Sequence, residues 1–147
     1  MAKFHYRMQN ILDIKEKLES QAKTEFAKEQ ENLRQEELKL SAIYADIEKY
    51  EERIRQMGQQ KLDVFELKRC NNAIKIKKYE AKNQKVKIKQ AEQKLDIVRA
   101  KLNKVMVERK TQEILKERAF NEFIKELEEQ ESKEVDEIVS FQFSRLK

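Results

Sequence analysis

Few residues in this chain are of a type that could do chemistry. His5 is the only histidine and Cys70 the only cysteine. A histidine metal site needs further ligands close by, and Asp13 and Glu16 lie two to three helical turns from His5. One cysteine excludes an internal disulfide and a thiolate zinc cluster, and one glycine excludes a glycine-rich phosphate loop. Carboxylates abound, but without a pocket to shift their pKa values. We therefore expect no enzyme and no metal or cofactor.

A run of lysines in the second half of the chain could neutralise phosphates. Aromatic residues do not interleave with it, and no groove-reading motif accompanies it. We expect a solvated helix face, offset in part by acidic residues of the first half, and no nucleic acid. An acidic protein, nucleic acid or anionic lipid stays open as an alternative partner. The run comprises Lys75, Lys77, Lys78, Lys82, Lys85, Lys87 and Lys89.

The composition predicts long helices. The chain has no proline and one glycine, Gly58, and 41% of its residues are charged. Proline would stop a helix and glycine weakens one. Only 39% of residues are hydrophobic, too few for a thick core but enough for a two-helix seam. No segment resembles a signal peptide or a bilayer span, so we expect a cytoplasmic protein.

Apolar residues recur at intervals of seven in both halves, which is typical of a coiled coil. The interval from Leu18 to Phe26 is eight, so we expect the stripe to shift there. In the second half we expect the repeat to break at Arg109. The repeating residues are Phe4, Ile11, Leu18, Phe26, Leu33, Leu40, Ile47 and Ile54, then Leu67, Ile74, Ala81, Ile88, Leu95 and Leu102, with polar companions at Glu29, Glu36, Lys77 and Gln84.

These patterns predict an all-α fold, a long two-helix antiparallel coiled-coil hairpin forming a single rod over residues 1–147. The first helix is expected over about 5–56, a turn at Gly58 over about 57–61, and the second helix over about 62–140.

Reflection about Gly58 predicts which residues face each other. Ile47 is expected near residues 69–71, Phe26 near residues 90–94 and Tyr6 near residue 110. Roughly 35 residues of the second helix would then overhang, at about 1.5 Å each. This open end carries an apolar stripe, and such a stripe usually marks a binding surface. The stripe comprises Phe120, Phe123, Ile124, Leu127, Val135 and Ile138.

Aromatic residues near the turn have separate expectations. Tyr50 falls on the seam and is expected to be buried, whereas Tyr44 lies one position off it. Phe65 opens the second helix and could close the hairpin by packing on Met57.

The first residues, Phe4-His5-Tyr6-Arg7-Met8-Gln9-Asn10-Ile11, resemble the opening signature of the FliJ family, an aromatic-x-aromatic-Arg-Leu/Met-Gln motif. Lys133-Glu134-Val135-Asp136-Glu137-Ile138 is similar to the closing stretch of that family. The length, the central turn and the two-helix layout match as well.

This resemblance implies a component of the bacterial flagellar type III export apparatus, similar in fold to the central stalk of rotary ATPases. The implied partners are the hexameric export ATPase, the cytoplasmic part of the export-gate membrane protein, and export chaperones. It further implies a free monomer that associates with the membrane at the flagellar base peripherally, through its partners.

The resemblance also suggests contact residues at both ends of the hairpin. Leu40, Tyr44, Tyr50, Phe65 and Ile74 are the candidates for contact with the export gate, although residues 70–73 stand where the family commonly has an aromatic. The candidates for contact with the ATPase are Tyr6, Arg7, Phe120, Phe123, Val135 and Ile138. Two other functions stay open: a basic rod that binds nucleic acid or anionic membrane, and a structural homodimeric coiled coil.

Overall fold

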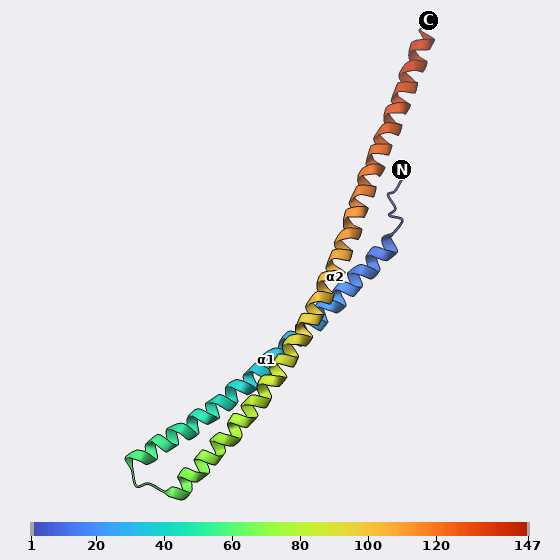
Figure 1. The fold of residues 1–147 in the computed structure, drawn as a ribbon. Helices are drawn as coiled ribbons and strands as arrows, with labels where there is room; N and C mark the ends of the chain where they lie inside the picture. Colours follow the sequence, from blue (N-terminus) through green and yellow to red (C-terminus); the bar gives the residue numbers. More distant parts are fainter. Residues whose placement is uncertain (1, 147) are drawn as a thin grey trace. The chain divides into compact units, whose positions relative to one another are not determined.

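A computed structural model describes residues 2–146. Helix α1 spans Gln9–Gln59 and helix α2 spans Val64–Arg145, and residues 60–63 join them (Figure 1). The described residues contain no strand. The helices pack antiparallel, which confirms the predicted all-α hairpin.

At the turn, α1 extends beyond its predicted end at about residue 56 and α2 begins after its predicted start at about residue 62, so the turn lies later in the chain. Gly58 is not the reversal point, because α1 continues through it to Gln59 and its φ is not positive. The reversal ends at Asp63, whose carboxylate Oδ1 accepts hydrogen bonds from the backbone N–H groups of Phe65 and Glu66, at 3.1 and 3.4 Å. An aspartate that accepts such bonds caps the first turn of a helix. Asp63 is therefore the residue in the sequence that indicates where α2 begins.

The later turn displaces the partners of α1 residues toward the C-terminus. Asp46 lies twelve residues before Gly58, so reflection would place it opposite Cys70. Its carboxylate instead lies 3.4 Å from the ammonium of Lys77. Phe26 was expected near residues 90–94, but its ring centroid lies 5.7 Å from the guanidinium of Arg99.

The chain packs as two units, which are described separately. One unit contains residues 2–21 and 103–146, and the other contains residues 22–102. Helices α1 and α2 each contribute to both units. A single rod over residues 1–147 therefore stays a prediction.

In the unit of residues 22–102, the seam follows the predicted heptads. Buried seam residues include Ile47 on α1 and Ala81 and Leu95 on α2. The buried apolar side chains of this unit are Ala22, Ile47, Cys70, Ala81, Ala91, Leu95 and Val98.

Two polar seam residues in this unit pair with each other. The buried Gln84 donates from Nε2 to the backbone oxygen of Glu36 at 2.9 Å, and also to the Glu36 carboxylate. The hydrogen bond from Gln84 is the main reason that the pKa of Glu36 lies below its ordinary value. A buried amide without partners would destabilise the seam, so Glu36 and Gln84 specify each other.

In the unit of residues 2–21 and 103–146, the α1 seam differs from the prediction. Leu12 is 2% exposed and Glu19 is 6% exposed, whereas Ile11 is 39% and Leu18 is 40% exposed. Leu12, Glu19 and Phe26 follow each other at intervals of seven. The expected shift between Leu18 and Phe26 is therefore wrong. The heptad is unbroken, but the sequence pattern does not reveal it because its member at position 19 is a glutamate and not an apolar residue.

The expected break at Arg109 is wrong for the matching reason. Arg109 follows Leu102 by seven residues and continues the seam of α2. Its guanidinium Nε donates to the Glu19 carboxylate, and a second nitrogen lies 3.4 Å from Glu19 Oε1. This hydrogen bonding, chiefly with Glu19, raises the pKa of Arg109. Two polar residues that interrupt the apolar pattern thus form one pair across the seam.

The Glu19–Arg109 pair predicts a characteristic mutational cycle. Replacing one residue, as Glu19→Leu or Arg109→Leu, removes the hydrogen bonds between these two side chains across the seam and is expected to lower the midpoint of thermal unfolding. The double variant is expected to be more stable than either single variant, since leucine suits both positions. Circular dichroism melts measure this, with Lys101→Leu at the exposed Glu25–Lys101 pair as the control. Additive losses in the double variant would contradict the pairing.

Gly58 predicts a second stability effect. A Cβ at this position would meet nothing within 4 Å, and the backbone is helical. Gly58→Ala is therefore expected to stabilise the protein by about 0.5 kcal/mol in urea unfolding, through helix propensity. Gly58→Asn serves as the comparison, because asparagine suits a left-handed turn better than alanine does. A destabilising alanine combined with a neutral asparagine would show that Gly58 forms the turn.

Candidate docking surfaces

Large apolar side chains are exposed along both helices, including Met8, Ile11, Ile14 and Leu18 near the start of α1, and three further stretches are candidate docking surfaces. The first is the hairpin tip, residues 60–65; the second is the basic stretch of α2, residues 75–90; the third is the C-terminal segment, residues 122–146. Helical seams normally bury such residues, so exposed groups of them are candidates for partner binding.

The hairpin tip presents a nearly bare aromatic ring. Phe65 is 85% exposed, so the expected packing on Met57 is wrong. Phe65 lies two residues before Leu67, about 200° around the helix, and so on the face opposite the seam. An ion pair joins the two helices near this end instead, with 2.7 Å between Arg53 Nη2 and Glu66 Oε1. Leu62 and Val64 are exposed beside Phe65.

The other residues predicted to contact the export gate lie mostly in the seam. Leu40, Tyr50 and Ile74 are half-buried. The burial expected of Tyr50 is thus only partial. Tyr44 is exposed, and the ammonium of Lys85 lies 5.7 Å from its ring centroid. Tyr44 and Phe65 are therefore the two candidates with substantial surface to offer.

The residues before α1 are held against α2. Tyr6 is 6% exposed, and its hydroxyl donates to Gln112 Oε1 at 2.9 Å. Its predicted position near residue 110 is confirmed. The Phe4 ring lies 5.2 Å from that of Phe120, edge to face, and 5.6 Å from that of Phe123. Aromatic pairs of this geometry stabilise packing.

Burial separates the residues predicted to contact the ATPase into two groups. Tyr6 is buried and Phe123 is half-buried, so both serve first to pack the hairpin. Every residue from 131 to 146 is exposed, as expected of helix that no other helix covers. The candidates with exposed side chains are Arg7, Phe120, Val135 and Ile138.

Sequence reasoning missed two groups of exposed apolar residues. One continues the C-terminal segment beyond Ile138 and consists of Val139, Phe141, Phe143 and Leu146. Its signal was the apolar pattern beyond residue 140, where the second helix was expected to end. The other group lies on α2 away from the seam and includes Ile76, Tyr79 and Val86. Its signal was a second set of apolar residues at spacings of three and seven.

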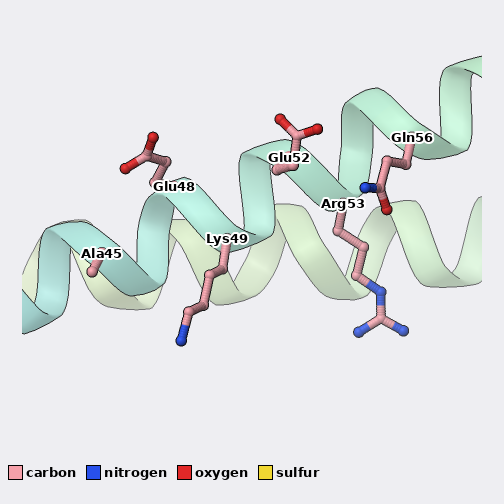
Figure 2. Close-up of a pocket in the computed structure, with 6 residues that line it drawn as sticks. All are labelled: Ala45, Glu48, Lys49, Glu52, Arg53 and Gln56. Atoms are coloured by element: carbon pink, nitrogen blue, oxygen red, sulfur yellow. The ribbon is translucent and has the colours of Figure 1, made fainter.

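A surface hollow on α1 offers no set of converging catalytic groups. Ala45, Glu48, Lys49, Glu52, Arg53 and Gln56 line it, and all six belong to this helix. In Figure 2 the carboxylates of Glu48 and Glu52 point to one side of the helix, while Lys49 and Arg53 point to the other. Among residues 2–146, no cluster of three or more His, Cys, Asp or Glu side chains could hold a metal ion.

The helices are also unlike membrane spans. Within residues 2–146, neither helix has a stretch both long and apolar enough to cross a bilayer.

Comparison with known proteins supplies the family. The family model described as "Flagellar FliJ protein" matches residues 4–147. No curated protein and no solved structure matches the chain. Because the family match covers nearly the whole chain, the protein belongs to the FliJ family of flagellar proteins, which are components of the flagellar export apparatus.

Proposed function

We propose that this protein is a non-enzymatic binding component of the flagellar type III export apparatus. It binds the hexameric export ATPase through the C-terminal segment and the cytoplasmic part of the export gate through the hairpin tip. The observation that carries this proposal is the uncovered apolar face of the C-terminal segment, which includes Val135 and Ile138. Nothing in the described part of the hairpin covers residues 131–146.

The packing at the start of the chain supports a role for this end. Phe4 and Tyr6 hold the first residues against α2 through Phe120 and Gln112. An ion pair then joins α1 to α2, with 2.7 Å between Lys15 Nζ and Glu108 Oε2. The first residues thereby help to form the base from which the C-terminal segment extends. We propose that Arg7 and Phe120, both exposed, contribute at the edge of the ATPase contact.

The hairpin tip is the proposed contact with the export gate. Phe65 provides an exposed aromatic anchor, and large aromatic side chains carry much of the energy of protein interfaces. Leu62 and Val64 extend the apolar area around it. Tyr44 contributes further along α1, whereas Leu40, Tyr50 and Ile74 support the contact from the seam.

A protein of this kind acts through differential binding. Contacts with one conformation of the ATPase ring that are stronger than those with another shift the ring toward that conformation. The tip acts on the gate in the same way. The protein also escorts export chaperones. It works in the cytoplasm and reaches the membrane at the flagellar base through its partners.

The ATPase contact predicts a loss of affinity when the exposed apolar face is made polar. Fully burying a Val or Ile side chain contributes about 1.5–3 kcal/mol, so Val135→Ser with Ile138→Ser is expected to weaken binding about a hundredfold. Isothermal titration against the purified export ATPase measures this, together with ATPase stimulation. Ser140→Ala with Ser144→Ala is the control on the other side of the helix. Equal affinity of both double variants would exclude this face as the contact.

The gate contact predicts a separable effect at the tip. Phe65→Ser is expected to weaken binding of the cytoplasmic part of the gate protein at least about tenfold, because it removes the aromatic anchor. Stability should be unchanged, since Phe65 is exposed. Ile97→Ser, which removes another exposed apolar side chain of the same unit, is the control. If both variants bind the gate fragment as the wild type does, the tip is not the contact.

A further inference from the structure

The basic stretch and the C-terminal segment carry opposite charge. The basic stretch, residues 75–90, contains seven lysines and one acidic residue, Glu80. The C-terminal segment, residues 122–146, contains eight acidic residues against two lysines and one arginine. Both stretches belong to α2, and both expose large apolar side chains.

The basic stretch has the pattern of an amphipathic helix on the side away from its seam. Ile76, Tyr79 and Val86 are exposed there. Lys75, Lys82 and Lys89 follow each other at intervals of seven and line one edge of this apolar stripe. Among residues 2–146, no carboxylate lies within ion-pair distance of Lys75, Lys78, Lys82, Lys85, Lys87 or Lys89.

The C-terminal segment carries the opposite charge on and beside its apolar face. Val135, Ile138 and Val139 form an exposed apolar face. Glu128, Glu131 and Glu134 lie within or beside this face, at spacings of three residues. No described cation forms an ion pair with these glutamates.

Both stretches belong to one helix, α2. A second copy of the chain supplies a surface of opposite charge for each of them. An anionic lipid surface or a nucleic acid fits only the lysines and repels the acidic segment.

We infer that the monomer implied by the family resemblance associates reversibly with a second copy, through the C-terminal segment of one and the basic stretch of the other. The apolar stripes of the two helices pack together, and the lysines beside the stripe of one copy form ion pairs with the glutamates on and beside the apolar face of the other. Because the two surfaces differ, the contact is heterologous, and each copy keeps one surface available for the next. Exposed charges supply its specificity, so it weakens with salt.

This contact has a consequence that rests on the proposed function. The C-terminal segment is also the proposed contact with the ATPase, so a self-associated copy cannot bind the ATPase through it. Self-association then holds unused protein in a form that the ATPase must displace.

The experiment is sedimentation velocity of the full chain over a concentration series, at about 0.1 M and about 1 M salt, where the Debye length falls from about 10 Å to about 3 Å. At low salt we expect the weight-average mass to rise above that of the monomer with concentration. At high salt we expect this rise to be lost. A monomer mass at every concentration in low salt would overturn the inference.

Charge reversal tests which surfaces are used. Lys75→Glu, Lys82→Glu and Lys89→Glu form one triple variant, and Glu128→Lys, Glu131→Lys and Glu134→Lys form the other. Each alone is expected to lose self-association, because its two surfaces then repel. An equimolar mixture is expected to regain it, because opposite charges meet again between unlike copies.

The control carries the same change of charge elsewhere: Lys17→Glu, Lys28→Glu and Lys49→Glu, all exposed. It is expected to associate as the wild type does. Circular dichroism establishes that each variant keeps its helix content. If the control loses association equally, or if the mixture of the two triple variants stays monomeric, the proposed pairing is wrong. These readouts contain no ATPase, so they stand or fall independently of the proposed function.

Discussion

The pairing of polar side chains across the helix seam holds this protein in one register. A two-helix seam has little apolar volume, and its alanines and leucines would also pack after a slide of one heptad. Polar partners remove that freedom. Gln84 reaches both the backbone and the side chain of Glu36, and Arg109 reaches Glu19. A slide would separate Gln84 from Glu36 and Arg109 from Glu19, and the loss of these hydrogen bonds across the seam would destabilise the pairing of the helices.

In this register, some apolar residues of the helices are buried in the seam and others are exposed to solvent. Ile47, Leu95 and Val98 lie in the seam of one unit, whereas Phe65 and Ile138 face solvent at different places on α2. The exposed residues are grouped, and each group has charged or polar neighbours. Such surfaces suit reversible binding to partners better than they suit an oligomeric core.

The described residues contain no cluster that suggests metal binding, and the charged groups around the hollow on α1 diverge. Ion pairs along single helices, such as Glu31 with Arg34, stabilise local helix. The hydrogen bond from Arg34, with one from Gln35, lowers the pKa of the exposed Glu31 to about 2. The membership of the FliJ family agrees with a protein that contributes surfaces to an export machine. The ion pair that shifts a pKa most, Glu31 with Arg34, stabilises helix α1 and forms no binding site.

The sequence alone determined the fold class, because the absence of proline and the heptads of α2 leave few alternatives to paired long helices. It also showed the family through the motif at Phe4–Gln9 and located the exposed Val135 and Ile138. Only the tertiary structure decided the seam near the N-terminus. A charged residue in a heptad reads as an interruption until its partner is known, and Glu19 and Arg109 stand 90 residues apart in the chain. The turn, predicted over about 57–61, lies at residues 60–63 for a related reason. Glycine at position 58 permits a turn but does not require one, whereas the cap at Asp63 decides where α2 begins.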